Sequence, residues 1–174
     1  MMNPSIYTIR KSFLLPLGLV VLLSFILLFS ALFLQLPTAK IIILGVFLLP
    51  VCIIFAESIF RKVYVTKDAV EINKLFRRKR LNYAELTAID TILVRKRAFV
   101  SLSSENDFMI LSNSYNHFGM MLKQLLENVP ENVVSEEIRN LAEAPPNKCS
   151  DVFSAWLAVA VLALIIYVQL RVLF

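Results

Sequence analysis

The residues of this chain best suited to chemistry are cations, and they fall in two short clusters. The first is Arg77-Arg78-Lys79-Arg80 and the second is Arg95-Lys96-Arg97. Guanidinium and ammonium groups form strong hydrogen bonds with phosphate and carboxylate groups. Residues 61–97 hold eleven Lys and Arg against four Asp and Glu, whereas residues 98–150 hold three against seven. The clusters therefore predict a surface for an anionic lipid headgroup or for a protein partner.

Nucleic acid fits this pattern less well. Aromatic residues do not interleave with the clusters, and no helix-turn-helix or zinc-binding pattern accompanies them. On a strand, successive side chains point to opposite faces, so only part of each cluster can contact one partner. A third interpretation is a solvated strand edge whose charges prevent pairing with other chains.

Signatures of catalysis are missing from the sequence. Of its three glycines only Gly119 lies between the apolar runs described below, so no glycine-rich phosphate loop is predicted there. The single histidine, His117, does not suffice for a multi-histidine metal site, and no G-x-S-x-G turn occurs. We therefore predict a protein without enzymatic activity, cofactor or metal ion.

One further pair of charged residues borders an apolar run. Glu57 and Arg61 are four residues apart, which places them on one face of a helix and predicts an ion pair. The alternative is a membrane enzyme or transporter component with a site at the cytoplasmic edge of the bilayer. A relay of protons or ions usually needs charged groups deeper in the membrane. The first and third apolar runs contain no Asp, Glu, Lys or Arg, which favours the ion pair.

Three uncharged apolar runs must position all of these groups. They cover residues 12–39, 41–56 and 152–170. A helix needs about 20 apolar residues to cross a bilayer, so we expect a hairpin of spans over 12–36 and 41–60 and a third span within 151–174. A hydrophobic content of 58% and a mean hydropathy of +0.71 also indicate an integral membrane protein. The first run is longer than the apolar core of a signal peptide.

Charges beside the spans predict their orientation. Arg10 and Lys11 precede the first span, Arg61 and Lys62 follow the second, and only Lys40 lies between them. Cytoplasmic segments carry the excess of Lys and Arg. We therefore expect the N-terminus and the central segment in the cytoplasm and the C-terminus outside.

The central segment alternates between apolar and polar residues, as strands do. The pattern predicts a hairpin over 63–72 around Lys67-Asp68, then strands near 75–81, 88–94, 98–103 and 108–111. After Asn113 the period changes to three and four, which predicts a helix capped by Asn113 and Ser114 and ended by Pro130. We divide the chain into a segment with the hairpin (1–60), a domain (61–130), a linker with one short helix (131–150) and a last span (151–174).

Three patterns in this segment resemble a known family. They are Arg61-Lys62-Val63-Tyr64-Val65-Thr66 directly after a helical hairpin, the run 76–81, and Tyr83-x-Glu85-Leu86-x-x-Ile89. They are similar to the bacterial pleckstrin-homology domain of small membrane proteins, whose members carry two spans before the domain. The resemblance covers residues 61–129. Phosphoinositide binding is not carried over, because the first turn holds only Lys67-Asp68.

The resemblance implies a membrane α + β protein. Its parts would be a transmembrane helical hairpin, a small antiparallel β-barrel or sandwich capped by a C-terminal helix, and then a third transmembrane helix. It also implies a scaffold or accessory subunit in a bacterial cytoplasmic membrane. Its partners would be membrane lipids and other membrane subunits or further copies of the chain.

Overall fold

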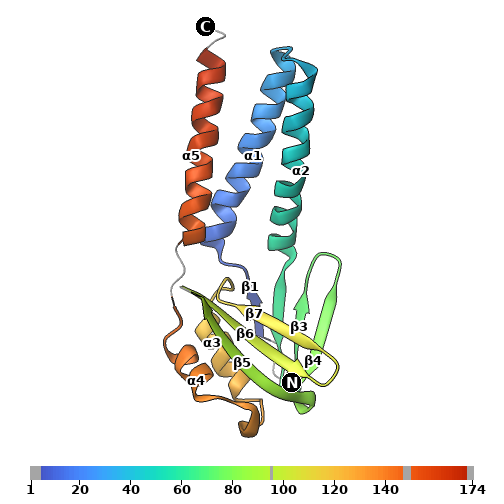
Figure 1. Ribbon diagram of the computed structural model, residues 1–174, viewed down its shortest axis with the longest axis vertical. Coiled ribbons are helices and arrows are strands. Elements are labelled where there is room, and N and C mark those ends of the chain that lie inside the picture. Colours follow the sequence, from blue (N-terminus) through green and yellow to red (C-terminus); the bar gives the residue numbers. More distant parts are fainter. Residues whose placement is uncertain (1–4, 95, 147–149, 172–174) are drawn as a thin grey trace. The chain divides into compact units, whose positions relative to one another are not determined.

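The computed structural model describes residues 5–94, 96–146 and 150–171, without the side chains of Asn132 and Ser150. The chain divides into two compact units, whose helices and strands are labelled in Figure 1. The helical unit combines residues 11–59 and 149–174, and the globular unit combines residues 1–10 and 60–148. Each is described by itself below.

The helical unit contains the predicted spans. Among the described residues, three helices are long and apolar enough to cross a membrane: α1 (Lys11–Phe33), α2 (Thr38–Phe60) and α5 (Ser150–Arg171). Most of their large apolar side chains are exposed, as expected of helices whose solvent is lipid. A Cβ atom added to Gly18 would lie 3.2 Å from the Phe55 ring, so glycine permits the close approach of α1 and α2. These helices confirm the membrane class of the protein.

The first sheet of the globular unit has four antiparallel strands in sequential order. They are β1 (Ser5–Thr8), β2 (Lys62–Val65), β3 (Ala69–Asn73) and β4 (Arg78–Asn82). The hairpin of β2 and β3 confirms the alternation in the sequence. Strand β4 begins later than expected, because the Lys74 amide donates to the Arg77 carbonyl at 2.8 Å and closes a turn.

Strand β1 was not predicted from the sequence. It lies before α1 and pairs with β2, whose residues follow α2, with Ser5 opposite Val65 and Thr8 opposite Lys62. The chain therefore leaves the sheet after β1, forms the two helices, and returns to the same sheet. The N-terminal segment belongs to the globular unit, whereas the sequence analysis grouped it with the spans.

The second sheet has three antiparallel strands, β5 (Leu86–Val94), β6 (Arg97–Ser104) and β7 (Phe108–Ser112). All three confirm the strands expected from alternation. The short 3₁₀ helix η1 (Tyr83–Glu85) leads the chain from the first sheet to the second. Inward side chains of both sheets are fully buried, among them Val63, Val70, Val100 and Leu111. Burial of this apolar surface is the main term that stabilises the unit.

Two helices complete the globular unit, and a short 3₁₀ turn, η2 (Glu131–Val133), lies between them in the chain. They are α3 (Phe118–Leu126) and α4 (Glu136–Glu143), which pack against each other (Figure 1). Helix α3 buries Phe118, Met121, Leu122 and Leu125, as the three-and-four spacing predicts. Helix α4 buries Ile138, Leu141 and Ala142. Helix α4, within the segment 131–150 that we expected as a linker, thus contributes to the core.

The predicted cap of α3 is wrong. The helix begins at Phe118, because the preceding residues form backbone bonds to other segments instead of a helical turn. The Asn113 amide donates to Ala98 at 3.0 Å, and the Asn116 amide donates to Thr8 at 2.8 Å. His117 occupies the position before the helix with a positive φ of 50°.

Three residues of the globular unit, each near an end of one of its chain segments, contact residues 113–115, which we call the junction segment. Just before α1, the Arg10 amide donates to the Ser114 carbonyl at 3.2 Å. Just after α2, the Arg61 guanidinium lies 5.9 Å from the centroid of the Tyr115 ring. Between α4 and α5, the Pro146 carbonyl accepts from Nδ2 of Asn113 at 3.0 Å. Within the globular unit, residues just before α1, just after α2 and just after α4 therefore all contact the junction segment.

Candidate functional site

Five cations line one groove of about 490 Å³ in the globular unit. We call it the basic groove, and its cations are Arg61, Lys74, Arg77, Lys79 and Arg97. Two hydroxyl residues, Ser112 and Ser114, also line it. The rest of its wall is apolar and consists of Ile72, Phe99, Phe108, Met109 and Ile110. None of the described residues that line it is Asp or Glu. The groove thus suits a ligand with an anionic group and an adjoining apolar part.

The first predicted cluster, of which residues 78–80 belong to β4, divides between two faces of the chain. Arg77 and Lys79 line the basic groove. Arg78 lines a different hollow, and Arg80 lies opposite Glu71 on β3. This division follows from the alternation of side chains along a strand.

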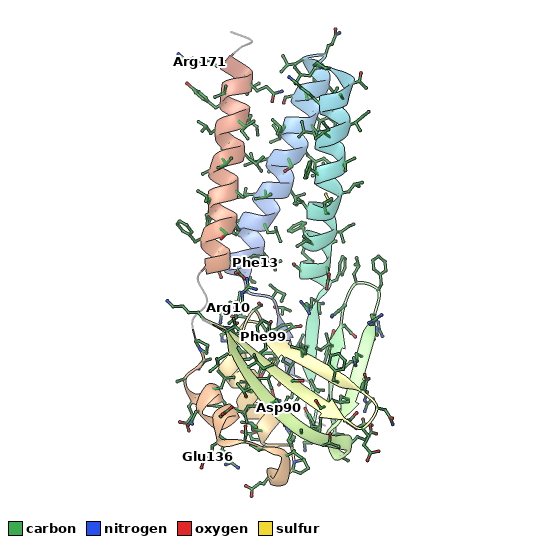
Figure 2. The ribbon with its side chains drawn as sticks, viewed as in Figure 1. Arg10, Phe13, Asp90, Phe99, Glu136 and Arg171 are labelled. Carbon is green, nitrogen blue, oxygen red and sulfur yellow. The ribbon has the colours of Figure 1, made fainter. Side chains whose placement is uncertain are left out.

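The second cluster contributes Arg97 to the groove. Arg97 begins β6 and lies two residues before Phe99, so both side chains leave the same face of the strand. Figure 2 labels Phe99 on this strand. Lys96 is exposed in the turn before β6, and its carbonyl accepts from Nδ2 of Asn113 at 2.9 Å. Arg95 lies outside the described residues. The two clusters therefore meet through Arg77, Lys79 and Arg97.

One ion pair joins the two sheets at the groove. Nζ of Lys79 on β4 pairs with Asp107 in the loop before β7, and lies 4.8 Å from the centroid of the Phe108 ring. The hydrogen bond from Lys79 is the main cause that lowers the pKa of the Asp107 carboxyl. Because Asp107 is exposed and ionised, it offsets part of the positive charge of the groove.

Arg61 belongs to the globular unit, where it lines the basic groove. Its side chain is half-buried in the globular unit, and its Nε is buried with no hydrogen-bond acceptor among the described residues. A buried N–H without an acceptor is costly, and an anion in the groove would supply one. Glu57 lies in the last turn of α2, in the helical unit. The ion pair of Glu57 with Arg61 stays a prediction.

Two residues of the basic groove were not predicted from the sequence. Lys74 is isolated from both clusters, and Arg61 was assigned to the membrane edge. The spacing of Arg77 and Arg61 holds no signal for their meeting, because they precede two different strands, β4 and β2. A signal for Lys74 did exist, since it precedes an apolar pair and a run of four cations at a hairpin turn.

No protein-family model, curated protein or solved structure matches this chain. The function must therefore be argued from the residues themselves.

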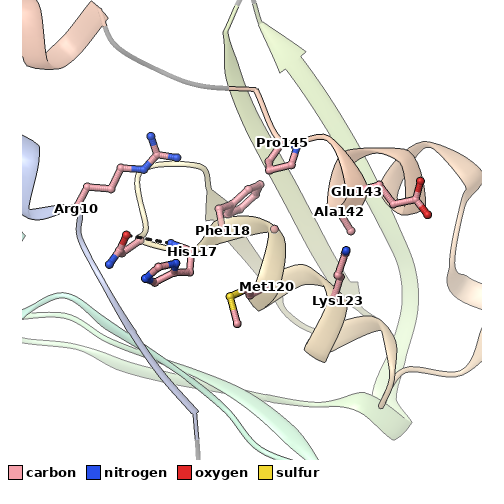
Figure 3. Close-up of a pocket in the computed structure, with 10 residues that line it drawn as sticks. Arg10, His117, Phe118, Met120, Lys123, Ala142, Glu143 and Pro145 are labelled. Carbon is pink, nitrogen blue, oxygen red and sulfur yellow. Dashed lines mark hydrogen bonds between the residues drawn. The ribbon is translucent and has the colours of Figure 1, made fainter.

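A second hollow, of about 510 Å³, lies between the start of α3 and the end of α4. Figure 3 shows Arg10 and His117 at one end and Glu143 at the other. A Cβ atom on Gly119 would lie 3.0 Å from the Ala142 carbonyl, so glycine lets α3 and α4 approach here. This hollow carries charges of both signs and is the weaker candidate for an anion. Within the described residues, no group of three or more His, Cys, Asp or Glu is placed to hold a metal ion.

Proposed function

We propose that this chain is a membrane-tethered binding module whose basic groove holds the anionic headgroup of a membrane lipid. The observation that carries the proposal is the convergence of five cations, from four strands and turns, on a groove lined by no acidic residue among those described. Cations near an anionic lipid surface each contribute about 1 kcal/mol to binding. Bound in this way, the module would serve as a scaffold or accessory subunit of a membrane complex.

Covalent continuity favours a lipid over a soluble anion. Arg61 directly follows Phe60, the last residue of a helix long enough to cross a membrane. The first cation of the groove is therefore one residue away from the end of that helix. A phospholipid also presents an apolar part beside its phosphate, which suits the wall formed by Phe99, Phe108 and Ile110.

The order of elements supports a pleckstrin-homology-like fold for the module. Four antiparallel strands are followed by three, and a helix with a buried apolar face follows them. In this proposal the helical hairpin is inserted between the first two strands. The Lys and Arg residues beside α1 and α2 support a cytoplasmic position for the module at a bacterial cytoplasmic membrane.

The proposal predicts that Arg77→Gln with Arg97→Gln weakens lipid binding. Loss of two cations removes about 2 kcal/mol, or roughly 30-fold in affinity. The intact protein in nonionic detergent would be titrated with phosphatidylglycerol, and bound lipid counted by native mass spectrometry. Glycerol phosphate and inorganic phosphate, added as competitors, separate recognition of the lipid from recognition of phosphate alone.

The matched control is Arg80→Gln with Lys96→Gln. These residues come from the same two clusters as Arg77 and Arg97 and carry the same charge, but neither lines the basic groove or the hollow that Arg78 lines. We expect this control to bind lipid within about twofold of the parent protein. Equal losses in both variants would show that only net charge matters and would overturn the groove as the site. Loss of a co-purified protein with unchanged lipid binding would reassign the groove to a protein partner.

A second prediction concerns Asp107, which pairs with Lys79 at the groove. Asp107→Asn removes that carboxylate and leaves the ammonium group of Lys79 for the ligand. We expect phosphatidylglycerol to bind about fivefold more tightly, the equivalent of one additional cation. Glu105→Gln is the control, because Glu105 is an exposed acid of the same loop. The same titration measures both variants, and a loss of affinity in Asp107→Asn would contradict the assignment of Lys79 to the ligand.

A further inference from the structure

The turn between β3 and β4 exposes an aromatic ring to an unusual degree. The Phe76 side chain is 93% exposed, more than any other large apolar residue described in the globular unit. Leu75 precedes it, Lys74 lies on one side of the pair, and Arg77 and Arg78 lie on the other. The hydrogen bond from the Lys74 amide to the Arg77 carbonyl closes the turn and holds the pair at its tip.

The same tip lies beside the end of α2. Leu75 and Phe76 line a hollow of about 480 Å³ together with Phe60, the last residue of that helix. Lys62 and Tyr64 of β2 line the hollow as well. All of these residues belong to the globular unit. Phe60 ends a helix long enough to span a bilayer, and Phe76 lines the same hollow as Phe60.

The chemistry of this tip suits a bilayer interface. Aromatic rings collect at the boundary between headgroups and acyl chains, and Lys and Arg beside them are attracted to anionic headgroups. Four cations line the hollow and none of its described residues is Asp or Glu: Lys62, Lys74, Arg77 and Arg78. A second copy of this chain would bring the same cations together and be repelled. An anionic lipid surface meets both the ring and the charges.

We propose that the tip Leu75-Phe76 inserts into the interface of the bilayer that holds the helices of this chain, with Lys74, Arg77 and Arg78 on the headgroups. The insertion would hold the β3–β4 turn, and with it Arg77 of the basic groove, at the level of the lipid phosphates. It does not depend on which ligand the groove binds, because it concerns the position of the Phe76 ring alone.

The test measures the depth of a tryptophan at the tip. The chain has one tryptophan, Trp156, so Phe76→Trp with Trp156→Phe places a single indole there. The full chain would be reconstituted in phosphatidylcholine and phosphatidylglycerol vesicles, with and without phosphatidylcholine brominated along its acyl chains. We expect blue-shifted emission, quenching by the bromolipid and protection from acrylamide.

The matched control is Lys67→Trp with Trp156→Phe. Lys67 is exposed in the turn at the other end of β3, and the five residues of that strand span about 17 Å at roughly 3.3 Å each. We expect red-shifted emission from this indole, strong quenching by acrylamide, and bromolipid quenching several-fold weaker than at position 76. Leu75→Trp with Trp156→Phe repeats the test at the same tip should the first variant fail to fold.

Two results would overturn the proposal. Equal bromolipid quenching at positions 76 and 67 would place the tip away from the bilayer. Blue-shifted emission at position 76 without bromolipid quenching would show that protein, from a second copy or another chain, covers the ring. Neither result bears on headgroup binding, which the Arg77 and Arg97 variants measure separately.

Discussion

The substitution Ile9→Asp is expected to destabilise the globular unit by about 3–5 kcal/mol, enough to unfold a marginally stable domain. Ile9 is only 5% exposed and forms an isolated bridge with Tyr115, far along the chain. An aspartate there would lose the apolar burial and would place an unpaired carboxylate inside the core. Urea-dependent limited proteolysis of the detergent-solubilised protein would measure the midpoint of unfolding.

Ile6→Asp is the matched control for this prediction. Ile6 lies on the same short segment, but it is 55% exposed on β1. Its replacement should change the free energy of unfolding by about 0.5 kcal/mol or less, as is usual for surface positions. Equal midpoints for the two variants would mean that the N-terminal segment is not part of the folded unit.

The prediction for Ile9 concerns the N-terminal segment with strand β1, which was not predicted from the sequence. Strand β1 has only four residues, so its alternation is too short to stand out, and its partner β2 lies beyond both helices of the hairpin. The strands from Val63 onward pair with their neighbours in sequence, and their alternation was sufficient to predict them. Local patterns thus predicted the local hairpins, whereas the long-range pairing of β1 with β2 left no periodic trace.

The same distinction separates the predicted and unpredicted parts of the basic groove. The sequence placed Arg77 and Lys79 in one cluster, and strand alternation correctly separated them from Arg78 and Arg80. The sequence did not predict Arg61 in the groove. Its place there depends on the path of the chain into β2, where the Arg61 guanidinium lies against the Tyr115 ring of the junction segment. A run of cations therefore indicates part of the basic groove, while the packing of the two sheets determines which cations line it.

Asn113 shows why a local motif can mislead. Asn before an apolar stripe is a common helix cap, but here the side chain is 1% exposed and donates to the carbonyls of Lys96 and Pro146. Buried carbonyl groups need hydrogen-bond donors, and an amide side chain supplies two N–H groups. At the junction segment, Asn113 therefore donates hydrogen bonds to carbonyl groups of distant segments and does not cap helix α3.

Helix α4 provides the second prediction with a large effect. Ile138→Ala should destabilise the globular unit by about 2–5 kcal/mol, because Ile138 is fully buried and its removal leaves a cavity in a packed core. We predicted this residue in a short helix of the linker 131–150, whose two prolines indicate an extended chain after that helix. A linker residue would tolerate the same change almost without cost.

Arg139→Ala distinguishes the core position from its neighbour. Arg139 is exposed, and its Nη2 lies 3.8 Å from Oε1 of Glu131, an ion pair at the surface that contributes about 0–1 kcal/mol. The urea midpoint of Arg139→Ala should therefore stay close to that of the parent protein while that of Ile138→Ala falls.

The Pro146 carbonyl, which accepts a hydrogen bond from Asn113, follows α4 by three residues. Loosening α4 should therefore also weaken this hydrogen bond. In Ile138→Ala, protease should then cleave residues 144–146 at a lower urea concentration than the β-sheets. Unchanged cleavage there would show that α4 does not stabilise the globular unit.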